Sequence, residues 1–280
     1  MRILIICRTM TYFSGSPLYN YTLAIELKKQ GHDVSVYSMW NKNELVDGFA
    51  DAKIMTFYKQ PTRKDGKFDL VIISQPDLKD ALDEIEAKKI INIVHSEYDV
   101  ETPITDKRID KYVVIRPSIK EHLIRSHGIK EENIKVVYNG IDFSRFSKSK
   151  RIINKNDYVK VVIPCTIDML RIKFLEYYSK LASKQYRVFI YGKAYSNSFT
   201  TNEWVFVNNE VFDIENYIAD ADIVAGILLG RINLEARAMG IVSIIHNPDD
   251  PEEKEIYFPE TKEFNKRHDI INVAKNILKV

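Results

Sequence analysis

Cysteine is scarce in this chain of 280 residues, which has only Cys7 and Cys165. Each lies in an apolar, strand-like run, and neither belongs to a Cys-x-x-Cys pair or to a cysteine and histidine cluster with zinc-site spacing. The sequence therefore argues against a disulfide framework and against a structural zinc site. Buried, reduced thiols are expected, which favours a cytoplasmic location.

The chain also lacks a charge imbalance and a long apolar run. It has 41 basic and 39 acidic residues, so a net charge of +2 gives no overall case for a nucleic-acid binder. Only the local basic clusters at 59–67 and 148–155 remain. The first apolar run, which ends at Cys7, is far too short for a signal peptide or a membrane span. No transmembrane segment is expected.

Composition and length indicate a globular protein of two domains. The chain is 45% hydrophobic, 29% charged and 11% aromatic, which argues against disorder. Its length suggests two domains. The polar, basic segment 147–158 has the composition of an interdomain linker, so we expect domains at 1–150 and 151–280. No internal repeat or low-complexity tract is visible.

Apolar runs alternate with segments of 3.6-residue periodicity, which predicts an α/β fold with parallel sheets in both halves. No G-x-G-x-x-G follows the first strand, so dinucleotide binding of the dehydrogenase kind is disfavoured. Strands are expected at 2–6, 34–39, 53–57, 70–74, 90–94, 112–115, 135–138, 160–164, 187–191, 204–207, 223–226 and 241–246. Helices are expected at 18–30, 79–87, 117–127, 173–183, 213–219 and 266–278.

The stretch from Gly226 to Gly240 is the most informative part of the sequence about function. It predicts a strand, a glycine turn, a short helix and a glycine stop. Arg231 and Glu235 are four residues apart and share a helix face. The free N–H groups of a helix start suit a phosphate, and a carboxylate one turn later suits a ribose diol. The alternative is an exposed ion pair on an ordinary α/β connection, and the residues alone leave the two evenly matched.

His95 directly follows the strand expected at 90–94. Open parallel sheets place their ligands at the carboxyl ends of their strands, so this histidine is a candidate functional residue. The alternative is a histidine hydrogen-bonded within a loop.

Four groups of residues resemble one enzyme family, and they occur in its order. They are Gly15, the step 31–34, the junction 138–142 followed by Phe146, and the stretch 234–240. Together they resemble the retaining nucleotide-sugar glycosyltransferases of the GT-B fold, closest to the large family with sucrose synthase-like and glycogen synthase-like enzymes. The resemblance covers most of the chain. It implies two Rossmann-like parallel-sheet domains facing a cleft, an acceptor domain at 1–150 and a donor domain at 151–280. The final helix, about 266–278, is expected to pack back on the first domain.

The resemblance also implies roles for individual residues. Glu235 resembles a glutamate that hydrogen-bonds the nucleotide ribose, and Gly230 and Arg231 resemble the turn beside the donor's phosphates and sugar. His95 resembles a histidine near the reacting sugar and is the catalytic candidate. The donor-binding candidates are Gly15, Ser16, Arg171, Lys173, Gly192, Gly230, Arg231 and Glu235.

Two departures from the family pattern are visible. Ile227 stands where the family commonly has a first, sugar-binding glutamate, eight positions before the second. The cations that bind the diphosphate have shifted spacing, with Arg171 and Lys173 as the candidates. The alternative for both is a solvated helix start.

The implied reaction is transfer of a sugar from a nucleotide-sugar donor to an acceptor hydroxyl, with retention and with no metal or cofactor. Fixed cations and helix starts would stabilise the leaving diphosphate. Asp220 and Asp222 form a D-x-D pair, the metal-binding pattern of another glycosyltransferase fold, but they precede a strand, and we expect them to end a helix and turn. The acidic run 249–255 is expected to be a solvated loop.

Three functions remain open. The acceptor could be a carbohydrate or a lipid-linked sugar. It could instead be a macromolecule such as DNA with hydroxylated bases, for which the two basic clusters are the hints. The third is a non-catalytic binder of nucleotides or sugars, suggested by Ile227.

Overall fold

The computed structural model describes residues 1–11, 13, 15–41, 43–97, 101–195, 199–227, 230–258 and 262–280. Contacts divide the chain into two compact units. The first comprises Met1–Tyr12, Ser16–Gly140 and Arg267–Val280, and the second comprises Phe13–Gly15 and Ile141–Lys266. Each is an α/β unit built around a sheet of its own.

The sheet of the first unit has seven parallel strands in the order β3-β2-β1-β5-β7-β8-β9 among the described residues. The strands are β1 (Arg2–Met10), β2 (Asp33–Asn41), β3 (Met55–Phe57), β5 (Leu70–Ile73), β7 (Ile90–Val94), β8 (Lys111–Val114) and β9 (Ile134–Val136). A separate pair joins β4 (Lys67–Phe68) to β6 (Glu86–Ala87). The helices are α1 (Gly15–Lys29), α2 (Asn43–Asp51), α3 (Pro117–His127), α8 (Ile270–Leu278) and the 3₁₀ turns η1 (Arg63–Asp65), η2 (Pro76–Asp83) and η4 (Glu131–Asn133).

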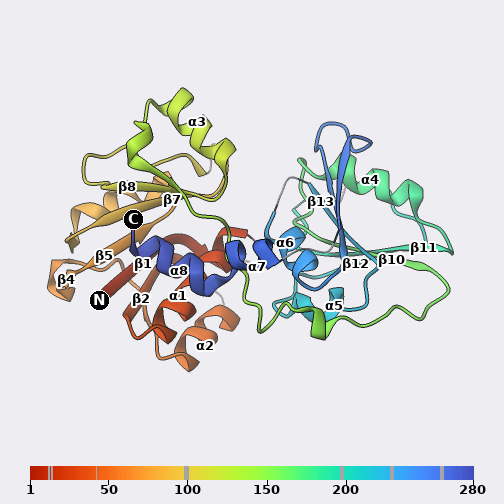
Figure 1. Ribbon diagram of the computed structural model, residues 1–280, viewed down its shortest axis with the longest axis horizontal. Coiled ribbons are helices and arrows are strands. Elements are labelled where there is room, and N and C mark those ends of the chain that lie inside the picture. The colour runs from red at the N-terminus through yellow and green to blue at the C-terminus, as the bar shows by residue number, and fades with distance from the viewer. Residues whose placement is uncertain are drawn as a thin grey trace. The chain divides into compact units, whose positions relative to one another are not determined.

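Helices cover both faces of this sheet, which explains why its inner strands are apolar throughout. Every residue of β5 and β7 is buried, as expected for parallel strands covered on both sides. Figure 1 shows α1 and α2 on one side of the sheet and α3 on the other. On one face, Leu4 and Ile6 of β1 share a core with Leu78 and Leu82 of η2.

The second sheet has the order β12-β11-β10-β13-β14-β15, and only its last pair is antiparallel. Its strands are β10 (Val159–Pro164), β11 (Tyr186–Tyr191), β12 (Val205–Asn208), β13 (Ile223–Ile227), β14 (Val242–His246) and β15 (Lys254–Tyr257). The helices are α4 (Ile172–Leu181), α5 (Ile214–Ile218), α6 (Arg231–Ala238) and the 3₁₀ turn η5 (Lys148–Lys150), while α7 (Lys262–His268) spans the division between the units.

Alternate residues of β10 supply two different cores, as the two-residue period of a strand requires. Val161 and Ile163 pack with Phe174 of α4. Val162 packs with residues of α5 and α6, including Leu234. The sheet is therefore sandwiched between α4 on one face and α5 with α6 on the other.

Apart from the short segment Phe13–Gly15, the chain enters the second unit after Gly140 and returns to the first at Arg267. The crossing at Gly140 lies ten residues before the expected boundary at 150, because Ile141 and Phe146 are buried in the core of the second unit. The last residues belong to the first unit. In it, His268 Nδ1 lies 2.8 Å from the Asn139 carbonyl oxygen, and Gln30 Nε2 donates to the Ile271 carbonyl at 3.3 Å.

Three expected elements differ from the structure, and one helix was not expected. A helix at 79–87 was predicted, but the chain forms η2 and then β6, because β6 pairs with β4 and Lys67 binds Glu86. The final helix is divided into α7 and α8, and Asp269 caps α8 by accepting from the Ile271 N–H. The structure also has α2, which was not anticipated. The end of the acidic run 249–255 enters β15, because the Asn247 N–H donates to the Glu253 carbonyl and closes a hairpin.

Both cysteines are unbridged, with Cys7 buried and Cys165 half-buried. Burial raises the pKa of the Cys165 thiol to about 12 and that of the Cys7 thiol well above its usual range. Both side chains are therefore neutral thiols at physiological pH. A bilayer-crossing helix is absent from the described residues.

Candidate functional site

The order of the second sheet defines a ligand-binding position. From β10 the chain proceeds outward to β11 and β12, then returns to form β13 on the other side of β10. At such a switch point, the connections that follow the two central strands run in opposite directions. Open α/β sheets bind ligands there, beyond the carboxyl ends of the strands. Here those ends lead to the starts of α4 and α6.

The start of α6 carries a buried ion pair. Gly230 precedes the helix in an extended conformation, and Arg231 is its first residue. Arg231 Nε donates to Glu235 Oε1 at 2.5 Å, and the two side chains are only 6% and 3% exposed. This excludes the exposed ion pair that the sequence left open. Removing two charges from water carries a desolvation penalty that their attraction often fails to offset, so a buried pair is weak evidence for a purely stabilising role.

The charges of this pair are incompletely satisfied. Burial raises the pKa of the Glu235 carboxyl, and the positive charges of Arg231 and Arg145 oppose that rise. Arg231 Nη1 is buried and has no hydrogen-bond partner among the described residues. A buried guanidinium N–H without an acceptor is costly. A ligand oxygen would remove that cost, so the arrangement suits an anionic or hydroxyl-bearing ligand.

Close packing of α6 on the sheet fixes the position of the pair. Buried Asn233 donates from Nδ2 to Ser243 Oγ of β14 at 2.8 Å. A Cβ atom added at Gly226 of β13 would lie 3.0 Å from Asn233 Oδ1. The missing side chain at residue 226 leaves room for the Asn233 side chain between α6 and the sheet. Arg231 and Glu235 are held on a rigid element.

The end of β10 is equally confined, by Gly192. A Cβ at Gly192 would stand 1.6 Å from the Cys165 carbonyl oxygen, a distance that no side chain can tolerate. The ends of β10 and β11 therefore approach each other closely only because residue 192 is glycine.

The two expected phosphate cations lie at the start of α4, at the same edge of the sheet. Arg171 occupies the N-cap position and is paired with Asp168. Lys173 is exposed, and its Nζ lies 3.5 Å from the Asp249 carbonyl. In this structure both side chains match the solvated helix start that the sequence left as the alternative. Each side chain has further N–H donors beyond this one contact.

The first sheet has its own switch point, between β1 and β5. Gln75 follows β5 in a left-handed conformation, with φ of 67°, and such strain in a residue other than glycine is often found at functional sites. Its Oε1 accepts from the Arg8 N–H at 3.1 Å, and its Nε2 lies 3.2 Å from Glu101 Oε1. Ser16 Oγ donates to the same carboxylate oxygen at 3.1 Å.

His95 lies at the carboxyl edge of this first sheet, after β7, and is 8% exposed. Its ring meets that of Tyr19 edge-on, with centroids 4.9 Å apart. Burial lowers the pKa of His95, and the negative charge of Glu101 opposes that effect. Within the described ranges its Nε2 has no hydrogen-bond partner. At neutral pH and above, His95 is therefore a neutral imidazole whose Nε2 is unsatisfied.

Sequence reasoning missed several polar residues at these two edges. Gln75 and Glu101 lie in segments with no recognisable pattern, and nothing in the sequence indicates the left-handed conformation of Gln75. Arg145 and Glu215 form a half-buried ion pair in the second unit. Arg145 could have been considered, because it immediately precedes Phe146, which carries part of the family resemblance.

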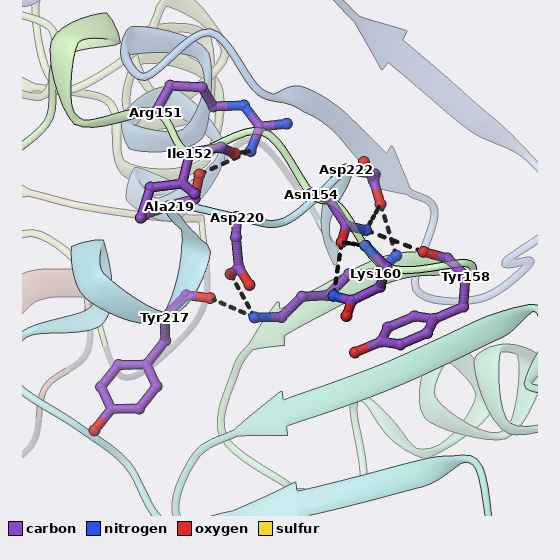
Figure 2. Close-up of polar contacts among 10 residues, drawn as sticks. Arg151, Ile152, Asn154, Tyr158, Lys160, Tyr217, Ala219, Asp220 and Asp222 are labelled. Carbon is purple, nitrogen blue, oxygen red and sulfur yellow. Dashed lines mark hydrogen bonds and ion pairs between the residues drawn. The ribbon is translucent and has the colours of Figure 1, made fainter.

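The D-x-D pair lies at the opposite edge of the second sheet, beside the amino ends of β10 and β13. Figure 2 shows Asp220 turned toward the side chain of Lys160 in β10, and Asp222 turned toward Asn154 in the segment that leads into β10. Asp220 accepts from Lys160 Nζ at 2.5 Å, and Asp222 accepts from the Lys160 N–H at 2.8 Å and from Asn154 at 2.6 Å. In the part of the chain that the structure describes, no histidine, cysteine and carboxylate group is arranged to hold a metal ion. Asp222 therefore anchors the linker segment at Asn154, and Asp220 pairs with Lys160 of β10.

Comparison with known proteins gives matches by structure alone. No family model matches the sequence, and no curated protein matches it. HepE of Anabaena, solved with UDP-glucose, matches with a TM-score of 0.75 and 11% identity over 100% of this chain and 99% of its own. A glycosyltransferase of Rickettsia africae matches with a TM-score of 0.65 and 14% identity over 99% and 87%.

A third match is an α-glucosyltransferase solved with UDP and a 13-mer DNA that contains an HMU base. Its TM-score is 0.58, with 10% identity over 87% of this chain and 79% of its own. At such low identities, the likeness establishes the fold and nothing finer. The expectation from the sequence is confirmed at that level: this chain has the GT-B fold of these glycosyltransferases.

Proposed function

We propose that this protein transfers a sugar from a uridine diphosphate sugar to an acceptor hydroxyl. One observation carries the proposal: the buried Arg231–Glu235 pair at the switch point of the second sheet has an unsatisfied guanidinium N–H. The fold supports the choice of ligand, because HepE, which shares it, was solved with UDP-glucose.

In this proposal the second unit binds the donor. Glu235 accepts hydrogen bonds from the ribose hydroxyls, and Arg231 turns its free N–H toward a phosphate oxygen. Gly230 leaves the start of α6 open, so the first N–H groups of the helix add to the positive potential there. Arg171 and Lys173 are further cations at the start of α4. Gly192 keeps the ends of β10 and β11 close together, and in this proposal both cations bind the same ligand.

The chemistry we propose is electrostatic and uses no metal or cofactor. As the bond from the sugar to the diphosphate breaks, negative charge grows on the leaving phosphate, and preorganised cations and helix N–H groups stabilise it. A leaving-phosphate oxygen takes the acceptor proton, and the sugar keeps its anomeric configuration. No protein nucleophile is assigned.

Two residues of the first unit have chemistry that suits the same donor. Ser16, at the start of α1 beside Gly15, has a hydroxyl that suits a diphosphate oxygen. The imidazole of His95, with its unsatisfied Nε2, suits a hydrogen bond to a sugar hydroxyl. A carbohydrate or lipid-linked sugar is the proposed acceptor.

Two rival functions have specific support. Likeness to the α-glucosyltransferase solved with DNA favours a hydroxylated DNA base as the acceptor. That function requires affinity for DNA that falls steeply with salt, and a flat response would exclude it. Ile227 favours a non-catalytic binder, because its side chain packs against the core around Phe174 and offers no polar group to a sugar.

The proposal is tested by incubating the purified protein with a panel of UDP-sugars and other nucleotide sugars, with and without acceptors, and measuring nucleotide release. Release from one or more UDP-sugars is expected, with a large loss in Glu235→Gln. The matched control is Glu203→Gln, which removes an exposed carboxylate of the same unit and leaves the rate unchanged. Binding of UDP with no release under any condition would establish the non-catalytic binder instead.

A further inference from the structure

Arg145 forms the most extensively hydrogen-bonded ion pair near the candidate donor site. Its Nε donates to Glu215 Oε1 at 2.8 Å and its Nη2 donates to Glu215 Oε2 at 2.7 Å. The same Nη2 donates to the Phe212 carbonyl at 2.8 Å. The side chains are 20% and 11% exposed. A two-pronged contact of this kind fixes the plane of the guanidinium as well as its position.

Aromatic packing also holds Arg145. Its guanidinium carbon lies 4.7 Å from the ring centroid of Phe212 and 5.4 Å from that of Phe146. Phe146 is fully buried in the core cluster that contains Leu234 and Ala236, the residues on either side of Glu235. Arg145 and Glu235 therefore flank one core, and the charge of each favours the ionised form of the other.

Three charged groups act on the Glu235 carboxylate, each from a different element. Arg231 lies on the same helix, Arg145 lies on the segment after the crossing at Gly140, and Glu215 lies on α5. The two arginines favour the ionised carboxylate, while Glu215 and burial oppose it. Arg231 donates its Nε–H to Glu235 and still has an unsatisfied Nη1 donor, so a bound ligand would share its positive charge with the carboxylate. Arg145 has three hydrogen bonds of its own and stays in place.

We propose that Arg145 is a positioning residue for Glu235: held by Glu215, it is the fixed positive charge that stabilises the carboxylate when Arg231 also binds a phosphate. The ligand in this statement rests on the proposed function, whereas the effect of Arg145 on Glu235 is a property of the protein without a ligand. An ionised carboxylate accepts hydrogen bonds from both ribose hydroxyls, which a protonated one does less well.

The unliganded protein provides the first test, by ¹³C NMR titration of the Glu235 carboxyl, assigned by its loss in Glu235→Gln. Arg145→Gln is expected to raise the titration midpoint, on the order of one pH unit for loss of a nearby opposite charge. Glu215→Gln is expected to lower it, because a negative neighbour is removed. Arg145→Lys, which keeps the charge, is expected to stay near the wild type.

Opposite shifts distinguish this role from a merely structural one, because both glutamine variants break the same ion pair. Shifts in the same direction, or no shift in either, would overturn the proposal. If Arg145→Gln fails to fold, Glu215→Gln and Arg145→Lys still decide the question through their expected midpoints, below and near that of the wild type.

Calorimetric titration with UDP between pH 5 and pH 8 separates this proposal from the proposed function. Arg145→Gln is expected to bind UDP more weakly than the wild type at the acidic end and to recover toward neutral pH. In a Glu235→Gln background the same change is expected to have no pH-dependent effect. Absence of UDP binding in the wild type would contradict the proposed function and leave the NMR result standing. Normal UDP binding with an unchanged Glu235 midpoint in Arg145→Gln would refute the role of Arg145 alone.

Discussion

The carboxylate of Glu235 and the guanidinium of Arg231 are removed from water together on the first turns of α6. Their spacing in the sequence predicts a shared helix face, but it cannot predict burial, which depends on distant segments. Phe146 and Arg145 come from the crossing segment, and Glu215 comes from α5. The sequence pattern therefore predicts the pair of Arg231 and Glu235. It does not predict that Arg145 and Glu215 lie near them, because that depends on how distant segments pack together.

His95 gives a prediction for the pH dependence of stability. Burial lowers the pKa of His95 below its ordinary value of 6.5, so below that pH the unfolded chain binds a proton that the folded chain resists. Stability is therefore expected to fall as the pH drops below 6.5 toward the folded pKa. The variant His95→Gln lacks this component, and its slope is expected to be shallower by up to about 1.4 kcal/mol per pH unit, the effect of one proton.

Urea unfolding of both proteins between pH 5 and pH 8 measures this difference. Above pH 7, where the histidine is neutral in both states, the wild type and the variant should have parallel pH profiles. Equal slopes below pH 6.5 would show that His95 is protonated as readily in the folded protein as in the unfolded chain, and would contradict a buried neutral imidazole.

At the scale of elements, β10 and β11 illustrate how a glycine shapes the site. These parallel strands pair from Val159 and Tyr186 through Pro164 and Tyr191. Just beyond them, Gly192 lies against the Cys165 carbonyl, in contact too close for any side chain. The connection to α4, with Arg171 at its start, therefore leaves β10 at a position that depends on Gly192.

Gly192→Ala is expected to destabilise the protein by about 1 to 3 kcal/mol, the usual cost of forcing an extra carbon into a packed region. The matched control is Gly15→Ala, because a Cβ at Gly15 meets no described atom within 4 Å, and its effect is expected within about 0.5 kcal/mol. Urea unfolding at one pH compares the two. Similar stabilities of the two variants would contradict the close approach of Gly192 to Cys165.

Sequence periodicity predicted the strands and helices that have a clear apolar pattern of their own. It missed the elements that form only because another strand pairs with them. The buried strands β5 and β7 and the helices α1 and α3 have patterns that decide their type. By contrast, β6 and β15 are short and polar and exist because a neighbouring strand pairs with them. A helix pattern at 79–87 was outweighed by that pairing. Gly48 lies inside α2 and lowers the helix propensity of that segment, so the sequence did not indicate a helix there.

At the scale of the whole molecule, the two units repeat one architectural solution. Each sheet reverses its strand order beside its first strand, and each places polar side chains beyond the carboxyl ends next to that reversal. In the first unit these are Gln75, Glu101 and His95, and in the second they are Arg231 and Glu235. The solved structures that match the chain over most of its length share this pair of sheets. The proposed donor site thus follows from topology as well as from the motif at 230–235.

Calorimetric binding of UDP and of 2′,3′-dideoxy-UDP to the wild type and to Glu235→Gln tests whether Glu235 binds the ribose of the donor. The wild type is expected to prefer UDP, and Glu235→Gln is expected to lose about 1 to 3 kcal/mol of UDP affinity, the scale of hydrogen bonds to a charged group. Binding of the dideoxy ligand should be almost unaffected by the substitution, because it has no hydroxyls for Glu235 to accept from. If UDP fails to bind the wild type, or if the substitution weakens binding of both ligands equally, Glu235 does not hold a ribose and α6 is not the donor site.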